Sequence, residues 1–185
     1  MPPEIIDTKI DGVRLIKPRA FGDDRGFFLE SFRAEFYLPL TGGKAFVQDN
    51  HSRSGKGVLR GLHYQLKHPQ GKLMYVVRGR ILDVAVDIRR GSTTFGQWVA
   101  FEISDSNHYQ MYMPPGIAHG FQVLSETADV TYKCTDYYYG DDQYGIAWND
   151  PQIGIDWDTA DPVLSERDNV WSMLKDIPKD RLPKI

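Results

Sequence analysis

The sequence predicts an all-β protein, a sandwich or a barrel, from three observations. Short apolar runs that alternate with polar residues recur through its middle, turn-forming residues separate them roughly every 8–12 residues, and helical periodicity is scarce. The 185 residues suffice for one domain with a sizeable core. Because no internal repeat, low-complexity tract or linker divides the chain, residues 1–185 are expected to form that single domain.

The strands are placed by alternation and by the turns that interrupt it. Gly79 separates two apolar runs, the second of which alternates with period two, and Pro114 and Pro115 end a later run. The expected strands are 75–77, 81–87, 98–103, 109–113, 121–124 and 130–134.

A few short peripheral elements complete the prediction. One short helix is expected at 34–37 and another after Ser165, where Asp168 stands three residues on, the spacing of an N-terminal cap. The tail 177–185 carries two prolines and four charges, so it is expected to be a loosely packed surface segment.

Composition excludes several classes of protein. A net charge of -3 argues against a general nucleic-acid binder, which needs a basic surface. The single Cys134 has no partner for an internal disulfide, which favours a reducing compartment. No apolar run is long enough to span a bilayer, and the N-terminal residues lack the pattern of a signal peptide. We therefore expect a cytoplasmic protein with neither nucleic acid nor membrane as partner.

The residues of greatest chemical interest are three cationic or titratable side chains close together in sequence. Arg60, His63 and Lys72 lie between expected strands, and His119 and Tyr132 follow later. Two cations beside a histidine are costly in a core but suit an anionic ligand. If these side chains converge on one pocket, they can grip an anion and move protons on it.

Each histidine also has an ordinary structural interpretation. His63 and His119 are the candidates for the pocket, and for both the alternative is a hydrogen-bonded structural histidine. His51, His68 and His108 stand among polar residues and are expected at the surface.

Three further segments allow either a structural or a functional interpretation. Arg25 lies in an Asp- and Gly-rich turn, which also presents it beside two phenylalanines. Gln48 and Asn50 follow an apolar run and are either turn formers or hydrogen-bonding groups for a sugar or nucleotide. The cluster 137–139 of three tyrosines is either packing or a stacking surface for a planar base.

The segment 114–119 raises the possibility of a metal site, because it resembles the second half of the cupin signature, Pro-x-Gly-x-x-His. Metal-binding cupins also carry a His-x-His pair and a downstream Glu. Here the first half offers His63 alone, and no Glu lies between it and Gly79. Two histidines without further ligands make a poor divalent site. The sequence thus predicts a pocket without a metal.

Seven sequence blocks in a fixed order resemble the dTDP-4-dehydrorhamnose 3,5-epimerase family over about residues 12–172. The blocks are FGDDRGFF at 21–28, FVQDNHS at 46–52, GVLRGLHYQ at 57–65, PQGKL at 69–73, DVAVD at 83–87, GIAHGF at 116–121 and WNDP at 148–151. The resemblance implies a metal-free jelly-roll β-sandwich of the cupin type. It also implies a homodimer that exchanges N-terminal strands.

The same resemblance implies roles for individual residues. The substrate is a dTDP-4-keto-6-deoxyhexose, whose ketone acidifies the hydrogens on carbons 3 and 5. His63 matches the family's base, Asp168 its carboxylate partner and Tyr132 its proton donor. Lys72 would stabilise the enolate oxygen, with help from His119. No cofactor is implied, because the ketone itself is the electron sink.

Further matches concern the nucleotide. Arg25 and Arg60 match residues that bind the diphosphate. The remaining matched contacts are Glu30, Gln48, Asn50 and Tyr138, the last as stacking partner for thymine. Gln143 or Tyr144 stands where the family often has a glutamate that touches the ligand, and Arg167 stands where it often has lysine. Gln143 and Arg167 are expected to touch the ligand.

Three functions therefore remain open at the level of the sequence. The leading one is inversion at both carbons. A narrower alternative is a 3-epimerase acting on a related dTDP-4-keto-deoxysugar. The third is a sugar-nucleotide-binding cupin without activity, which His63, Asp168, Tyr132 and Lys72 together argue against, because a binder needs no acid–base pair.

Overall fold

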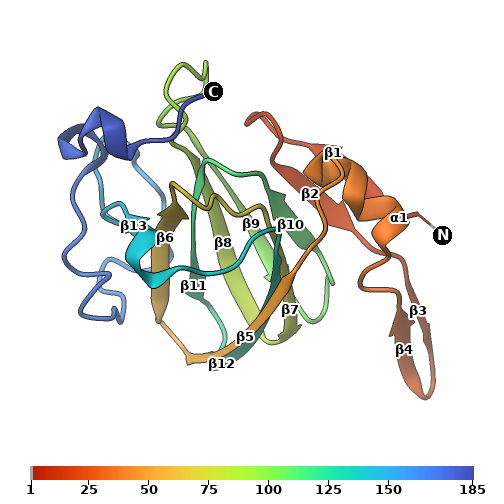
Figure 1. Ribbon diagram of the computed structural model, residues 1–185. Coiled ribbons are helices and arrows are strands. Elements are labelled where there is room, and N and C mark those ends of the chain that lie inside the picture. Colours follow the sequence, from red (N-terminus) through yellow and green to blue (C-terminus); the bar gives the residue numbers. More distant parts are fainter. Residues whose placement is uncertain (1) are drawn as a thin grey trace.

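The computed structural model describes residues 2–185 and shows two antiparallel sheets packed face to face (Figure 1). The six-stranded sheet has the order β1 (Glu4–Asp7), β2 (Arg14–Lys17), β10 (Gln110–Met113), β7 (Lys72–Arg78), β12 (Thr127–Cys134) and β5 (Gln48–Gly55). The five-stranded sheet has the order β13 (Gln143–Gly145), β6 (Leu59–Gln65), β11 (Ile117–Val123), β8 (Arg80–Asp87) and β9 (Trp98–Ser104). The prediction of an all-β sandwich is confirmed.

The helical elements are short and peripheral, as expected. The α-helix α1 spans Ala34–Tyr37, which agrees with the predicted helix at 34–37. Short 3-10 helices occupy Leu38–Thr41, Gly140–Asp142, Leu174–Asp176 and Lys179–Arg181. No helix within residues 2–185 is long and apolar enough to cross a membrane.

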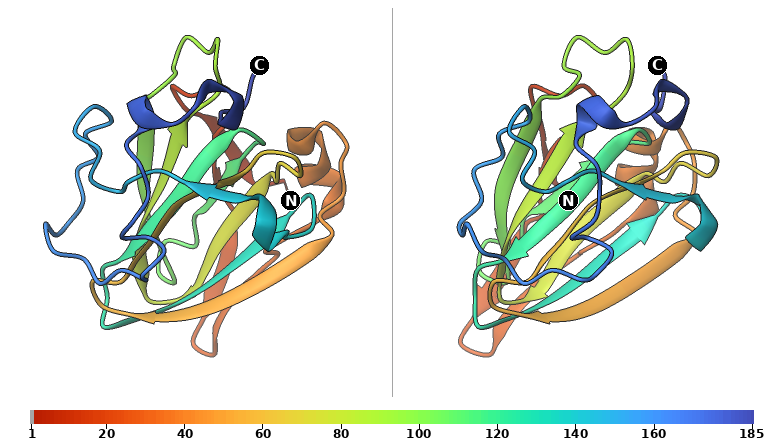
Figure 2. Two further views of the ribbon diagram at one scale, coloured as in Figure 1. Left: turned by 60° about the vertical axis from the view of Figure 1, so that its left-hand side comes forward. Right: turned by 90° about the vertical axis from the view of Figure 1, so that its left-hand side faces the viewer.

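Alternation along the strands divides the apolar residues between two cores. In β8, Ile81 and Ala85 face the interior between the sheets, whereas Val84 and Val86 belong to a second cluster on the outer face of the five-stranded sheet. That outer face is covered by the C-terminal part of the chain, which crosses it (Figure 2). Because neighbouring residues of a strand point to opposite faces, a polar residue at an inward position must lie inside the sandwich.

Tight turns join several of the strands, and Gly79 shows why. It links β7 to β8 with a φ of 82°, a conformation that favours glycine. A Cβ at this position would also lie 2.1 Å from the carbonyl oxygen of Thr127. The turn therefore requires glycine for its backbone conformation and for the close approach of β12.

The structure corrects the predictions at several points. The segment after Ser165 is a turn rather than a helix, although Asp168 N does donate to Ser165 Oγ at 3.1 Å. Gln48 begins strand β5 rather than following a strand, because its neighbours pair with β12. Strand β11 begins at Ile117, four residues before the predicted 121–124.

The C-terminal tail 177–185 lies at the surface but is anchored to the sandwich at several points. Leu182 is buried in the outer core, and Tyr64 Oη donates to the carbonyl oxygen of Arg181 at 2.9 Å. Arg90 N donates to the carbonyl oxygen of Pro183 at 2.8 Å. Proline and charge along 177–185 disguise Ile177 and Leu182, the apolar residues that dock this tail, although six of its nine residues are exposed.

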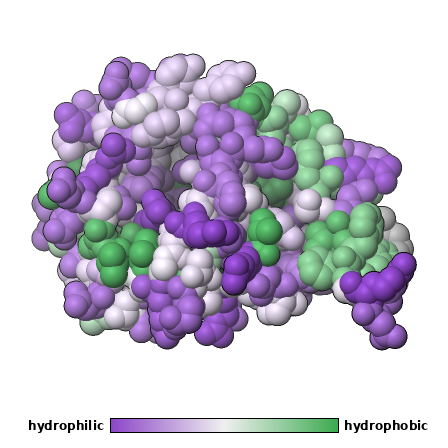
Figure 3. Space-filling view, turned by 90° about the horizontal axis from the view of Figure 1, so that it is seen from below, coloured by the Kyte–Doolittle hydropathy of each residue, from purple (hydrophilic) through white to green (hydrophobic). Residues whose placement is uncertain are grey.

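A β-hairpin stands apart from the sandwich. Within residues 2–185, strands β3 (Ala20–Asp23) and β4 (Gly26–Leu29) pair only with each other, and they project from the body in Figure 1. Phe21, Phe27 and Phe28 on this arm are 48%, 59% and 71% exposed. The space-filling view shows hydrophobic surface gathered on the arm behind a hydrophilic tip (Figure 3). Exposed apolar area of this kind marks an interaction site.

Candidate active site

A cavity of about 720 Å³ opens between the two sheets. Its lining consists of Gln48, Asn50, Ser52, Arg60, His63, Tyr64, Gln65, Gln70, Lys72, His119, Phe121, Tyr132, Tyr138, Gln143, Ser165, Glu166, Arg167 and Asp168. All the residues predicted for the site are therefore brought together here except Arg25 and Glu30.

Strand alternation explains why these polar side chains point inward. On β6, Leu62 and Tyr64 pack in the outer core, so His63 between them faces the interior. On β11, Ile117 and Phe121 belong to the inner core, and His119 shares their face. The same reasoning places Lys72 beside Met74 on β7 and Tyr132 beside Val130 on β12. Both sheets thus contribute polar groups to one end of the sandwich interior.

The first titratable pair is His63 with Asp168. His63 Nε2 lies 2.5 Å from Asp168 Oδ1. Burial alone would raise the pKa of Asp168, but hydrogen bonds with His63, Ser165 and Trp171 lower it below its usual value. Asp168 is therefore a charged acceptor, so His63 must donate its Nε2 proton to it. That tautomer leaves Nδ1 of His63 with a free lone pair.

A second buried pair lies deeper in the pocket and was not assigned from the sequence. His119 Nε2 lies 2.7 Å from Asp83 Oδ1, and Asp83 has no exposed surface. The other oxygen, Oδ2, has no hydrogen-bond partner among the described residues. Asp83 shares the inward face of β8 with Ile81 and Ala85. A carboxylate at an inward position of the alternating run 81–87 was the signal that could have revealed it.

Burial is the main cause of the pKa shifts in and around this second pair. It lowers the pKa of His119 and of Lys72 and raises the pKa of Asp83. Lys72 has no ion pair with a carboxylate within residues 2–185, although it is close enough to Asp83 for their charges to interact. A desolvated ammonium without a contact partner is well placed to receive a developing negative charge.

Tyr132 faces the cavity from the sheet opposite His63. It lies on β12 of the six-stranded sheet, whereas His63 lies on β6 of the five-stranded sheet. Burial is the main cause that raises the pKa of Tyr132 above its usual value, and the nearby Cys134 adds to it. The phenol therefore keeps its proton at neutral pH. The pocket thus presents a proton acceptor on one wall and a proton donor on the other.

The wider end of the cavity carries cations and hydrogen-bonding groups. Arg167 Nη1 donates to Gln143 Oε1 at 2.7 Å, and Tyr138 Oη donates to the same oxygen at 2.5 Å. Arg60 Nε donates to Ser54 Oγ at 3.0 Å. Within residues 2–185, neither arginine has an ion pair with a carboxylate. Two guanidinium groups without a counter-charge in one cavity indicate an anionic ligand.

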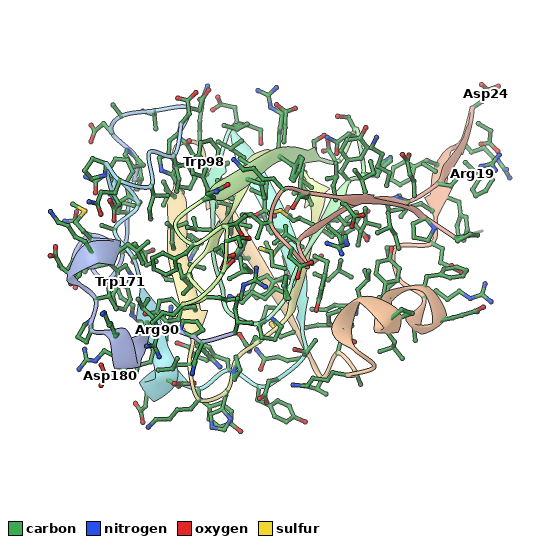
Figure 4. The ribbon with its side chains drawn as sticks, turned by 90° about the horizontal axis from the view of Figure 1, so that it is seen from above. Arg19, Asp24, Arg90, Trp98, Trp171 and Asp180 are labelled. Atoms are coloured by element: carbon green, nitrogen blue, oxygen red, sulfur yellow. The ribbon has the colours of Figure 1, made fainter. Side chains whose placement is uncertain are left out.

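Arg25 and Glu30 lie outside this cavity in the same chain. Arg25 pairs with Asp23 on the arm, and its side chain is 89% exposed. Glu30 lines a small separate cavity at the base of the arm, next to Phe36. Figure 4 places Asp24, at the tip of the arm, and Trp171, which contacts Asp168, at opposite ends of the molecule. Arg25 and Glu30 were predicted to lie in the pocket, but in the single chain they lie outside it.

The remaining histidines do not line the cavity. The side chains of His51 and His68 are 60% and 44% exposed, as expected. His108 differs from the expectation, because its ring packs against Phe27 with a centroid distance of 4.4 Å and is partly buried.

A jelly-roll-like sandwich whose interior holds an acid–base pair and unpaired cations defines a class of enzyme that moves protons on an anionic substrate. Comparison with known proteins specifies it further. Residues 7–176 match the family model described as dTDP-4-dehydrorhamnose 3,5-epimerase. The chain belongs to this family.

Individual relatives agree with the family match. The dTDP-4-dehydrorhamnose 3,5-epimerase of Pseudomonas aeruginosa is 54% identical over 161 residues, which cover 86% of this chain and 89% of the relative. That of Neisseria gonorrhoeae is 53% identical over 167 residues, 89% of this chain but 51% of the relative. The chain thus spans about half the length of the Neisseria protein.

Solved structures give the same answer for the fold. The epimerase RmlC from Legionella pneumophila, in complex with dTDP-4-keto-L-rhamnose, has a TM-score of 0.95 and 51% identity, covering 99% of this chain and 98% of that one. ChmJ from Streptomyces bikiniensis, a 3'-monoepimerase in complex with dTDP-quinovose, has a TM-score of 0.90 and 32% identity, covering 100% and 93%. The cupin-type fold, the family and the isomerase class are confirmed.

Proposed function

We propose that this chain converts dTDP-4-dehydro-6-deoxy-D-glucose to dTDP-4-dehydro-L-rhamnose, a step of dTDP-L-rhamnose biosynthesis, by inverting carbons 3 and 5. The observation that carries the proposal is the placement of His63 and Tyr132 on opposite walls of one cavity. Epimerisation removes a proton from one face of a carbon and returns one to the other face. It therefore needs an acceptor and a donor on opposite sides of the sugar.

His63 acts as the base. Its Nδ1 takes the proton from carbon 3 or 5, because Nε2 is bound to Asp168. The imidazolium that forms is stabilised by the charged carboxylate, whose low pKa keeps it ionised throughout. His63→Ala should therefore abolish turnover while leaving the affinity for dTDP nearly unchanged.

The electrons left on carbon flow into the ketone at carbon 4, and the resulting enolate oxygen needs a cation. Lys72 supplies it, with His119 beside it in the deep part of the cavity. In a partly dry pocket such stabilisation is worth several kcal/mol. Tyr132 then donates its proton to the opposite face of the carbon, and the enolate returns to a ketone. No cofactor takes part, because the substrate carries its own electron sink.

The wide end of the cavity holds the nucleotide. Arg60 and Arg167 bind the diphosphate, since planar guanidinium groups suit paired oxyanions. Tyr138 is half exposed at the cavity wall and provides a ring for the thymine. Asn50 and Gln143 contribute hydrogen bonds at the same end.

The arm completes the site in a homodimer that exchanges N-terminal strands. It carries Arg25 and Glu30, which lie outside the cavity of their own chain, and it exposes three phenylalanines. Docking the arm on a second copy would bury this apolar surface and bring the two charged residues to the partner's nucleotide site. Light scattering after size-exclusion chromatography should give a dimer, and a monomer at micromolar concentration would oppose the proposal. A cytoplasmic location is proposed with it, because the single buried Cys134 suits a reducing compartment.

The narrower 3-epimerase reaction is a second candidate, which ChmJ represents among the similar structures. The higher identity to proteins described as 3,5-epimerases favours the double inversion. A binding protein without activity is disfavoured, because the His63–Asp168 pair has no use in binding alone.

The decisive experiment is proton NMR of dTDP-4-keto-6-deoxyglucose incubated with the protein in deuterium oxide. Deuterium should appear at carbons 3 and 5, and His63→Asn should prevent it. His68→Asn, at an exposed histidine outside the cavity, is the matched control and should exchange like the wild type. Exchange at carbon 3 alone would indicate the narrower enzyme, and no exchange at either carbon would refute both.

A further inference from the structure

Three glutamines hold one short stretch of backbone at the cavity wall. Gln65 Nε2 donates to the carbonyl oxygens of His68, at 2.7 Å, and Tyr137, at 3.3 Å, and its Oε1 accepts from Tyr139 N at 3.0 Å. Gln48 Oε1 accepts from Tyr138 N at 2.8 Å. We call Gln48, Gln65 and Gln70 the glutamine clamp.

The third member of the clamp binds the start of the same stretch. Gln70 Nε2 donates to the carbonyl oxygen of Asp136 at 2.9 Å. The clamp therefore engages backbone groups of four successive residues, 136–139, from three separate places in the fold. Gln48 lies on β5, Gln65 at the end of β6 and Gln70 just before β7.

Gln65 is the centre of this arrangement. It is only 6% exposed, and both its donor and its acceptor groups are in use. A buried amide must be paired, and only an amide side chain combines two N–H donors with a carbonyl acceptor. Glutamate in its place would lose both donors, and methionine, of similar length, would lose every bond.

The residue that the clamp positions is Tyr138. Its backbone N–H is bound by Gln48, and the neighbouring residues on both sides are bound by Gln65. At the other end its hydroxyl donates to Gln143, which Arg167 also binds. The ring is thus held at both ends while its face stays half exposed.

We propose that the glutamine clamp, through Gln65, positions Tyr138 at the depth required to stack on the nucleotide base and thereby sets the affinity of the enzyme for dTDP sugars. This inference rests on the proposed role of Tyr138. It also changes the assignment of Gln48, whose Oε1 binds Tyr138 N and whose Nε2 binds Asn50 Oδ1 at 3.0 Å. Gln48 is accordingly a positioning residue rather than a direct contact of the nucleotide.

The test is Gln65→Met in the full-length protein, compared with Gln122→Met. Gln122 is an equally buried glutamine that accepts a backbone bond from Asp158 N at 2.9 Å but does not line the cavity. Gln65→Met should raise KM and the Kd for dTDP about tenfold, the range that one base–aromatic stack contributes. Its kcat at saturation should stay within about twofold, and its Kd for inorganic pyrophosphate should not change. Gln122→Met should lose thermal stability without altering KM.

The outcomes separate this inference from the proposed function. If Tyr138→Ala weakens dTDP binding but Gln65→Met does not, the clamp is refuted and the stacking role stands. If Tyr138→Ala leaves dTDP affinity unchanged, the stacking role itself fails. Equal losses of dTDP and pyrophosphate affinity would show a general structural defect instead. If Gln65→Met does not fold, the partly exposed Gln70→Met takes its place with the same expected pattern at smaller amplitude.

Discussion

The indole of Trp171 occupies the space that a side chain on Gly145 would need. A Cβ at position 145 would lie 2.4 Å from the ring. Gly145 pairs directly with His63 across the sheet, and Trp171 Nε1 donates to Asp168 Oδ1 at 3.4 Å. The absence of a side chain on β13 therefore lets the indole reach behind the acid–base pair and support its carboxylate.

Gly145→Ala should consequently disturb the catalytic pair from a residue that does not touch the substrate. Overpacking of this kind costs about 1–3 kcal/mol of stability, and the displaced indole should lower kcat about tenfold with little change in KM. The measurements are thermal unfolding and steady-state kinetics. Gly55→Ala is the control, because the nearest atom to a Cβ there is 4.0 Å away. Wild-type kcat in Gly145→Ala would show that Trp171 does not position the pair.

Asp168→Asn should reduce kcat by roughly 10²–10⁴-fold, the range for loss of effective acid–base catalysis. The neutral amide neither enforces the reactive tautomer of His63 nor stabilises its imidazolium. Affinity for dTDP, measured by calorimetry, should change by less than about twofold, because Asp168 contacts the histidine rather than the nucleotide. A variant with full activity would remove the carboxylate from the mechanism.

Tyr132→Phe should separate proton removal from proton return. His63 remains in place, so exchange of substrate hydrogens with deuterium oxide should continue, while formation of the inverted product falls. In the wild type the raised pKa of Tyr132 keeps the donor protonated to a higher pH than an ordinary tyrosine allows. The alkaline fall in rate that this phenol causes should therefore lie at higher pH than an ordinary tyrosine would give, and it should vanish in the variant. Unchanged product formation would assign the donor elsewhere.

Asp87 should make folding stability depend on acid pH. Its side chain is buried, which by itself would raise the pKa, but bonds from Arg89, Ser92 and Thr94 lower it to about 2 from 3.8. A carboxyl with a lowered folded-state pKa stabilises the protein above its unfolded pKa and loses that effect as pH falls through the folded value. The contribution is about 2 kcal/mol. The difference in unfolding free energy between wild type and Asp87→Asn should shrink between pH 4 and pH 2; a constant difference would contradict this.

Activity should survive metal chelators. The first half of the cupin signature offers His63 without a second histidine or a nearby glutamate, so a divalent ion would lack ligands. The rate is to be measured before and after dialysis against EDTA. Loss of activity that an added metal restores would overturn the metal-free mechanism.

Local pattern in the sequence was enough for much of the fold. Period-two alternation and Gly or Pro turns marked most of the strands, and the alternating run 81–87 was placed almost to the residue. The predicted residues that line the cavity could be named because their chemistry and the family resemblance are both visible in the order of the residues. Helix 34–37 was found from its local periodicity.

Errors arose where partners far apart in sequence decide the structure. The segment after Ser165 has the pattern of a helix cap, yet it does not continue into a helix. Its Asp168 binds His63 on β6 instead. The anchoring of the tail was not predicted, because the outer core that buries Leu182 is built from distant strands. The place of Arg25 on the arm, outside the cavity of its own chain, could not be read from its sequence block either.

Residue order alone therefore sufficed for the class of fold, the family and the identity of the principal acid and base candidates, since periodicity and motif chemistry are local properties. The pairing of Asp83 with His119 was settled only by the register of the neighbouring strands β8 and β11. The glutamine clamp on residues 136–139 and the placement of Trp171 against Gly145 were settled only by the packing of segments far apart in the sequence. Such contacts depend on strand register and on the direction in which each side chain leaves its strand, which non-local packing determines.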